Sequence, residues 1–307
     1  MARLPKLLVS SVIRGTRSGE IHGGLYLVDL ERGSAELKLD WNRADIDFSG
    51  RGGDRGLRGI AFHGSNILVA SNSELLILDQ DFAIRETFAN PFLRHCHEIC
   101  VAQDRVFLTS TGFDSVLSFD LKTRRFAGAW YLGERDGTFG LRPFDPGTFA
   151  GPAASNRFHL NSITVSESGL WLCGLSTPGL LHADGRRVAL AAPLPPGTHN
   201  ARMFEGGVLY NDTAADRVCH QRNGSVREIA VPDFPAGDII NVENLPPELA
   251  RPRFARGLCV LPDGLIAGGS SPSTVAVYDL HAGRCIVQHT LSMDVRNAVH
   301  GLAPWPY

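Results

Sequence analysis

The sequence predicts an all-β fold, a six-bladed β-propeller that occupies residues 1–307 as a single domain. Three observations favour this fold. A short apolar run headed by one polar residue recurs along the chain, each complete repeat continues with a turn and a second apolar run, and the two ends of the chain are incomplete in complementary ways. Self-similarity of this kind is typical of propellers, in which each repeat is one blade. The polar residues that head the runs are Arg58, His97, Asn161, Asn200, Arg256 and His300.

Each repeat divides into strands, ordered from the inner edge of the blade outward. The polar residue heads the first strand, and short β-branched or aromatic stretches bounded by Gly, Asp, Asn and Ser mark the others. Second strands are expected at 66–70, 105–109, 169–173, 207–211 and 264–268. Third strands are expected at 115–121 and 273–280, and outer strands at 35–40, 83–88 and 285–291.

The ends of the chain predict how the propeller closes. The N-terminal part begins with a second strand, Leu7 to Ile13, whereas the C-terminal part ends on an unpaired first strand, His300 to Trp305. Pairing between these two strands completes one blade and protects sheet edges that an open repeat would expose. The blade count is therefore six.

Three long connections interrupt the repeat. The intervals between successive polar residues alternate between short and long, and the extra residues fall at 41–56, 133–158 and 233–254, each just before a first strand. All three are therefore expected on the rim where the polar residues lie. Long connections of this kind are usually functional loops, so they predict a lid over a binding site. The alternative is that they only cap an open channel or form a subunit contact.

Composition and charge limit the classes of partner. The formal net charge is -2 and there is no run of Lys or Arg, which argues against nucleic acid. No apolar segment is long enough to span a bilayer, and the apolar N-terminal stretch is interpreted as a strand rather than a signal peptide. The six cysteines lack zinc-site spacing and mostly fall in predicted strands, so reduced thiols and a cytoplasmic location are expected.

The six polar residues are expected to meet on the propeller axis. Arg58 and Arg256 present rigid guanidinium groups that match a carboxylate or phosphate, so they are predicted to bind an anionic substrate. Asn161 and Asn200 would then fix its polar groups, with His199 beside them. The alternative is that both arginines donate hydrogen bonds to backbone carbonyls and only brace the axis.

Proton transfer is the chemistry that the imidazoles of this set suggest. His97 and His300 can donate or accept a proton near neutral pH, which makes them candidate catalytic residues. Glu98 is the adjacent carboxylate that could orient an imidazole or act as a base, unless strand alternation points it between blades. We therefore expect a lyase, isomerase or hydrolase that acts on a small anionic molecule.

Metal binding is the alternative for the same region. A divalent ion such as iron, zinc or copper is the only cofactor suggested, and the candidate ligands are His97, His159, His199 and His300. Two arginines in the same set would repel a cation unless an anion lay between them. A third possibility is a non-catalytic propeller that binds a protein or ligand at its rim.

The blade segments Leu160–Val165 and Arg256–Gly264 resemble those of six-bladed propellers of the gluconolactonase and strictosidine-synthase supergroup, and more loosely of NHL-like propellers. The resemblance implies the architecture. Gluconolactonase-like enzymes hold a divalent cation on the axis with carboxylate and amide side chains, and Asn161 and Asn200 would match the amide positions. Because none of the six polar residues is a carboxylate, calcium-dependent lactonase chemistry is not expected here. The metal-dependent alternative is instead a His-ligated enzyme, lactonase-like or oxygenase-like.

Overall fold

The computed structural model describes residues 4–49, 54–243, 245–246 and 250–307. Within these residues the strands form six antiparallel sheets, and the only helical segments are two short 3-10 turns, Ala236–Asp238 and Pro262–Gly264. The chain is thus all-β, a six-bladed β-propeller, as the sequence predicts. Parts of two predicted rim loops, residues 50–53 of 41–56 and residues 244 and 247–249 of 233–254, lie outside the described residues. No helix in the described part is long and apolar enough to cross a membrane.

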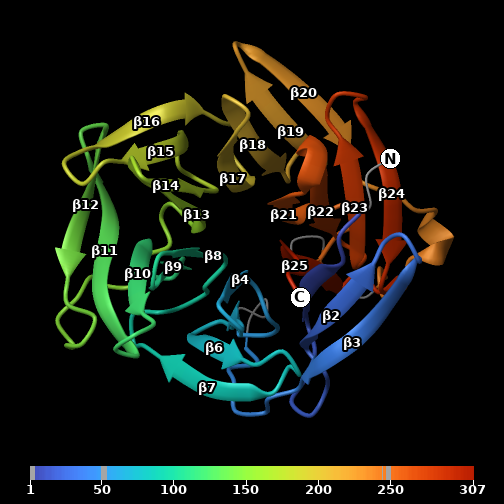
Figure 1. Cartoon of the computed structure of the whole chain (residues 1–307), viewed down its shortest axis with the longest axis horizontal. Coiled ribbons are helices and arrows are strands. Elements are labelled where there is room, and N and C mark those ends of the chain that lie inside the picture. Colours follow the sequence, from blue (N-terminus) through green and yellow to red (C-terminus); the bar gives the residue numbers. More distant parts are fainter. Residues whose placement is uncertain (1–3, 50–53, 244, 247–249) are drawn as a thin grey trace. The chain divides into compact units, whose positions relative to one another are not determined.

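The chain divides into two compact units, Met1–Ile60 with Glu205–Tyr307, called unit 1, and Ala61–Phe204, called unit 2. Figure 1 labels most of their strands. Whether one folding domain spans 1–307 stays a prediction. In unit 1 one sheet has the order β25-β1-β2-β3, and another has the order β21-β22-β23-β24. Their bounds are β1 Leu7–Ile13, β2 Gly23–Asp29, β3 Ser34–Trp41, β21 Arg256–Val260, β22 Ile266–Ser270, β23 Thr274–Asp279, β24 Arg284–Thr290 and β25 Asn297–Pro304.

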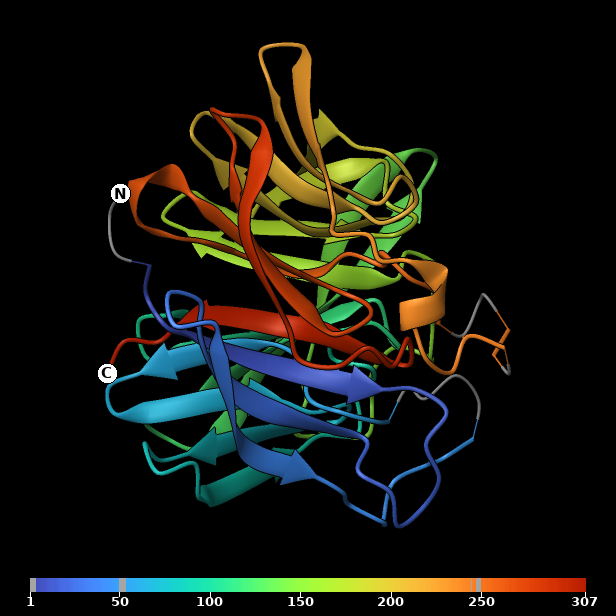
Figure 2. The ribbon, with the colours of Figure 1, turned by 90° about the vertical axis from the view of Figure 1, so that its right-hand side faces the viewer.

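The predicted closure is confirmed within unit 1. Strand β1 pairs with β2 on one side and with β25 on the other, so that Leu7 lies opposite both Val28 and Pro304. Figure 2 shows the red strand β25 running beside the blue strands. The side chains of β1 are buried, and Leu7, Val9 and Val299 belong to one apolar core with residues of β22 and β23. Burial of these side chains from water stabilises the pairing.

Unit 2 contains one five-stranded and two four-stranded sheets in its described residues; β4 begins at its boundary. The strands are β4 Ile60–His63, β5 Asn66–Ala70, β6 Glu74–Leu78 and β7 Ile84–Ala89; β8 Ile99–Ala102, β9 Arg105–Ser110, β10 Ser115–Asp120, β11 Arg125–Arg135 and β12 Thr138–Phe144; and β13 Leu160–Ser166, β14 Gly169–Gly174, β15 Gly179–Ala183 and β16 Val188–Pro193. The remaining sheet has the order β17-β18-β19-β20, with bounds Thr198–Phe204, Gly207–Asp212, Arg217–Arg222 and Ser225–Ala230.

The predicted loop 133–158 begins as a hairpin, which corrects part of the sequence interpretation. Strand β11 extends to Arg135, and β12 pairs with it through a two-residue turn at Asp136 and Gly137. Both turn residues have positive φ, 52° and 78°, which matches the twist of an antiparallel hairpin. The sheet therefore gains a fifth strand, and only the segment after Phe144 remains a loop before β13.

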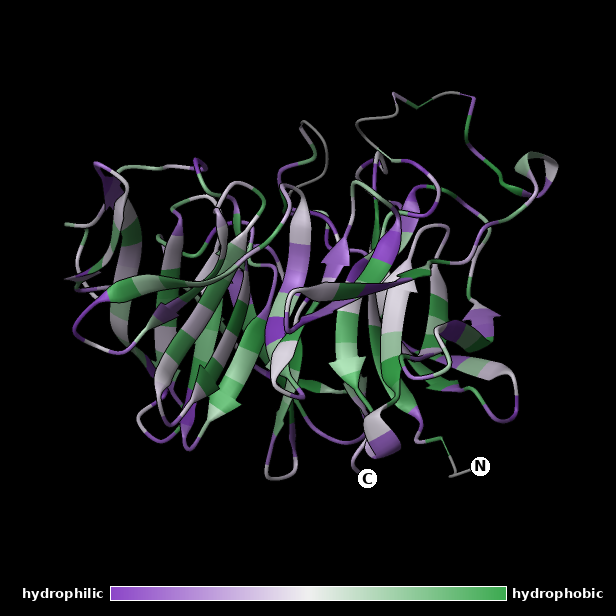
Figure 3. Cartoon of the chain, turned by 90° about the horizontal axis from the view of Figure 1, so that it is seen from above, coloured by the Kyte–Doolittle hydropathy of each residue, from purple (hydrophilic) through white to green (hydrophobic). Residues whose placement is uncertain are grey.

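Burial follows the order of strands within each blade. The second and third strands carry most of the fully buried residues, whereas outer strands such as β3 and β20 are mostly exposed. Figure 3 shows the hydrophobic colour concentrated in the strands and the hydrophilic colour in many connecting turns. In unit 2 one core joins Leu68, Leu108, Leu117 and Phe119, and another joins Leu160, Ile163 and Leu172. These cores fix the ends of β8 and β13, where predicted site residues lie.

Candidate functional site

Three histidines of unit 2 form a cluster at the starts of its inner strands. His97 precedes β8, His159 precedes β13, and His199 lies in β17. The ring centres of His97 and His159 are 5.1 Å apart, and each lies 6.4 Å from the ring centre of His199. The side chain of His199 is buried, and those of His97 and His159 are half-buried. The structure thus brings together three of the four histidines that were considered as metal ligands.

Each ring of this cluster is oriented through its Nδ1 atom. Nδ1 of His97 lies 2.7 Å from the carbonyl oxygen of His95, and Nδ1 of His199 lies 3.1 Å from that of Gly197. Nδ1 of His159 lies 3.0 Å from Oδ1 of Asn156. Because a carbonyl or amide oxygen only accepts, each Nδ1 carries the proton and the lone pair of the neutral ring is on Nε2.

The hydroxyl of Thr111 holds His97 as well. Its Oγ1 atom donates to the carbonyl of Leu160 at 2.6 Å and lies 2.9 Å from Nδ1 of His97, from which it accepts. Thr111 is fully buried at the end of β9. The orientation of His97 is therefore fixed by groups from its own sheet and tied to the start of β13.

Glu98 points into the contact between inner strands. Its carboxylate accepts from the backbone N–H of Ile163 at 3.2 Å, from Nδ2 of Asn200 at 3.4 Å and from Nη2 of Arg202 at 2.9 Å. Burial raises the pKa of the Glu98 carboxyl, and the charge of Arg202 and the hydrogen bonds oppose that rise. One side chain therefore links β8 to β13 and β17, which is the inter-blade orientation that the sequence left open.

The two predicted amides have different surroundings. Asn161 is 1% exposed, donates from Nδ2 to the Thr198 carbonyl at 3.1 Å, and accepts from Ser162 Oγ through Oδ1 at 2.8 Å. Asn200 has a positive φ of 54° and donates to Glu98. Both side chains thus connect inner strands of unit 2, and their predicted contact with a substrate stays a prediction.

β-Bulges mark the starts of inner strands in both units. The register of β13 against β14 shifts between Leu160 and Ser162, so that Asn161 is the extra residue. In unit 1 the register shifts at Gly257 in β21 and at His300 in β25. Such bulges re-aim side chains and are frequent next to functional sites. In β13, β21 and β25 the bulge therefore lies at or beside the polar residue that the sequence analysis singled out.

The predicted residues of unit 1 lie on neighbouring segments. A Cβ atom at Gly257 would lie 3.0 Å from the carbonyl oxygen of His300, and one at Gly301 would overlap the carbonyl oxygen of Arg58. Only glycine allows the backbones to approach so closely. The side chains of Arg58, Arg256 and His300 are 4%, 9% and 8% exposed. Arg256, His300 and Arg58 thus follow one another along adjacent strands, as their order in the repeats predicts.

Asp114 is a site-building residue that the sequence analysis missed. It is 1% exposed, and its carboxylate accepts from Ser155 Oγ at 2.8 Å and from the backbone N–H groups of Arg157 and Phe158 at 2.7 and 3.2 Å. It also accepts from the N–H of Leu160, at 3.4 Å. The carboxylate thereby fixes the segment that carries His159. In the sequence Asp114 resembles an ordinary turn residue, so no local signal marks this role.

Metal coordination has less geometric support. In the part of the chain that the structure describes, no group of three or more His, Cys, Asp or Glu side chains is arranged to hold a metal ion. The six cysteines are free thiols.

Comparisons with known proteins show the fold and no family. No family model matches the chain, and no curated protein matches it in sequence. A protein of unknown function from Bacteroides caccae is 13% identical, with a TM-score of 0.59 over 99% of this chain and 100% of that one. A chain of a nidogen/laminin complex is 12% identical, with a TM-score of 0.58 over 97% of each chain, in agreement with the resemblance to NHL-like propellers. A streptogramin B lyase is 13% identical, covers 73% of this chain and 68% of its own, and has a TM-score of only 0.43, too low to bear on function.

Proposed function

We propose that this protein is an enzyme that binds a small anionic molecule beside His97, His159 and His199 and transfers a proton on it. The observation that carries the proposal is the three-imidazole cluster, in which every ring is held through Nδ1. Three imidazoles at one place offer proton acceptors when neutral and attract an anion when protonated. Elimination, isomerisation and hydrolysis all need such a group.

His97 is the base in this proposal. It contacts both other rings, and its Nδ1 proton is shared between the His95 carbonyl and Thr111 Oγ1, so that Nε2 accepts the substrate proton. Hydrogen bonds from the imidazolium to these oxygens stabilise the positive charge that forms. Glu98 acts as a positioning residue rather than as the base, because its carboxylate already accepts three hydrogen bonds.

A second part of the proposal concerns Arg58, Arg256 and His300 of unit 1. Each of Arg58 and Arg256 would bind a carboxylate or phosphate through bidentate hydrogen bonds, and His300 would be a second group that carries a proton. Their burial and their order on neighbouring strands of unit 1 support a role for the three residues together.

A metal-dependent enzyme is the second candidate. Histidines that bind metals usually donate their other ring nitrogen to an oxygen, which is the arrangement of all three rings in the cluster. The rings would have to rotate to bind one ion, because they are not arranged to hold it in this structure.

Exchange of substrate hydrogen with solvent tests the proposal. The protein is incubated in D2O with a panel of small carboxylates and phosphate esters, and loss of C–H signals is followed by proton NMR. His97→Gln should slow exchange about 100-fold or more, whereas His182→Gln, at a half-buried histidine that stacks on Trp171, should not change it. Exchange that persists unchanged in His97→Gln, His159→Gln and His199→Gln would refute the proposal. Exchange that needs added zinc or iron would favour the second candidate.

A further inference from the structure

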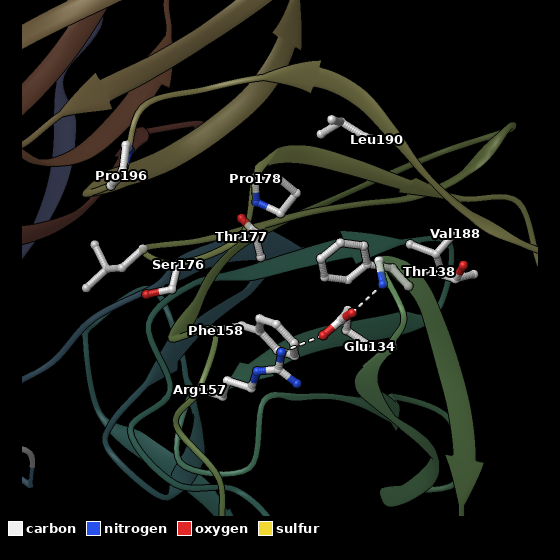
Figure 4. Close-up of a pocket in the computed structure, with 13 residues that line it drawn as sticks. Glu134, Thr138, Arg157, Phe158, Ser176, Thr177, Pro178, Val188, Leu190 and Pro196 are labelled. Carbon is white, nitrogen blue, oxygen red and sulfur yellow. Dashed lines mark hydrogen bonds and ion pairs between the residues drawn. The ribbon is translucent and has the colours of Figure 1, made fainter.

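Unit 2 contains an open groove of about 950 Å³ that the proposed enzyme site does not use. Figure 4 shows its walls, which come from the β11–β12 hairpin, from Arg157 and Phe158 before β13, from the turn between β14 and β15, and from β16 and the residues after it. The volume lies in the range of small-molecule sites. Residues from four separate parts of the sequence thus form one concave surface.

Apolar side chains form most of the groove. Phe139 and Phe158 pack with ring centres 5.6 Å apart, while Val188 and Leu190 project from the same face of β16. Leu190 is 47% exposed although it borders a concave surface. A ligand that covers Leu190 and Phe139 would remove apolar surface from water while few polar groups lose their hydration.

One charged pair lies at the groove. Arg157 donates from Nη2 to Glu134 Oε2 at 2.5 Å, and its guanidinium carbon lies 5.0 Å from the centre of the Phe158 ring. The Arg157 side chain is 61% exposed, and in the described part of the chain this is its only side-chain hydrogen bond. Four of its five N–H groups are therefore available to a ligand.

Glu134 orients this guanidinium. It also accepts from the backbone N–H of Gly137 at 2.6 Å, and this hydrogen bond, with Arg157, lowers the pKa of the Glu134 carboxyl. The carboxylate occupies one edge of the arginine and stays ionised. The rest of the guanidinium is oriented for a second carboxylate, the partner that its fork geometry suits best.

The groove is preformed rather than assembled by a ligand. Asp114 accepts from the backbone N–H groups of Arg157 and Phe158, and the N–H of Ser176 donates to the Phe158 carbonyl at 3.1 Å. Both the charged end and the apolar wall are thereby fixed to the sheet. A preformed site loses less conformational entropy on binding.

We propose that this groove binds a small amphipathic carboxylate, with its apolar chain or ring along Phe139, Val188 and Leu190 and its carboxylate on Arg157. The site is independent of the proposed proton-transfer chemistry. A purely apolar ligand would leave the exposed donors of Arg157 unused, and an amphipathic cation would face the guanidinium.

Displacement of a fluorescent probe tests this site. The probe is 1-anilinonaphthalene-8-sulfonate, and the competitors, kept below their micelle concentrations, are dodecanoate, dodecanol and dodecyltrimethylammonium. Dodecanoate should displace the probe at least about tenfold more strongly than either comparator, because only its carboxylate can accept charge-assisted hydrogen bonds from Arg157. No displacement by dodecanoate, or equal displacement by all three, would overturn the proposal.

Variants locate the binding. Leu190→Asp and Arg157→Gln should each weaken dodecanoate binding about tenfold. Matched controls are Leu37→Asp, an exposed leucine of β3, and Arg135→Gln, an exposed arginine of the same hairpin. Unchanged binding in Leu190→Asp and Arg157→Gln would refute the location. If a variant does not fold, dodecanoate is added to the unaltered protein and the NMR chemical shifts of the backbone amides of Arg157, Ser176 and Thr177 are followed. Shift changes at these residues would support the location, and unchanged shifts would refute it.

Discussion

Glu98 and Arg202 provide the sharpest test of how the inner strands of unit 2 are held together. Their side chains are 11% and 22% exposed and approach to 2.9 Å, so solvent screens this ion pair little. Replacing Glu98 by Gln puts an amide N–H₂ in place of one oxygen that accepts hydrogen bonds, so that it faces the donors of Ile163, Asn200 and Arg202. We expect the free energy of unfolding to fall by about 3 kcal/mol, at the upper end for a buried hydrogen-bonding group that loses its partner.

Replacing Arg202 by Gln should lower the free energy of unfolding less than replacing Glu98. In Arg202→Gln the carboxyl of Glu98 can bind a proton, because burial already raises its pKa above the usual 4.5, whereas a guanidinium stays charged. We expect the free energy of unfolding to fall by about 2 kcal/mol in Arg202→Gln and by about 3 kcal/mol in the double variant. The coupling energy is then about 2 kcal/mol, typical of a hydrogen bond between charged groups.

Urea unfolding at pH 7.5, followed by tryptophan fluorescence, measures the four members of this cycle. Equal m-values for the four proteins would show that each exposes the same amount of surface on unfolding, so that their free energies can be compared. Additivity of the two single losses within about 0.5 kcal/mol would refute the reasoning.

The pH dependence has a definite sign: a carboxyl whose pKa is raised by folding adds stability below pH 4.5, and this contribution is lost as the pH rises through the folded-state pKa. Glu98→Gln should remove that slope.

Three further predictions concern other buried groups. Asp114→Ala should speed amide hydrogen exchange at residues 155–160 by at least about tenfold, because their N–H groups lose a shared acceptor; unchanged exchange there, with faster exchange elsewhere, would contradict this role. Burial raises the pKa of Cys100 to about 12 and that of Cys173 to about 11, so neither thiol should react with iodoacetamide at pH 8 until urea unfolds the chain, as mass spectrometry can check. Burial lowers the pKa of His22, so its contribution to stability is present above pH 6.5 and is lost as the pH falls through the folded-state pKa; His22→Gln should flatten this part of the stability profile, and an unchanged slope would count against it.

The blade pattern could be predicted because it is local and repeated. Apolar runs at fixed offsets from Arg58, His97 and Arg256 identify inner strands without any knowledge of distant contacts. Closure by β1 and β25 follows from counting strands at the two ends. The β11–β12 hairpin was missed although Asp136 and Gly137 are a strong turn signal, because the long spacing favoured interpretation as a loop.

The site was harder to predict because its contacts join residues far apart in sequence. Glu98 accepts from Arg202, and Asp114 accepts from the backbone near Phe158, and neither partner is apparent from local pattern. Strand alternation gives two possible directions for a side chain, and bulges at Asn161 and His300 change that direction again. The histidines were found because each stands beside the start of an inner strand.

The pairing of β1 with β25 also affects how the chain folds during synthesis. Unit 2 is one continuous stretch, whereas unit 1 combines Met1–Ile60 with Glu205–Tyr307. Leu7 and Val9 therefore emerge from the ribosome long before their partners Pro304 and Leu302 exist. Until then β1 keeps an unpaired apolar edge, which is the kind of segment that chaperones bind and that aggregates when they are absent.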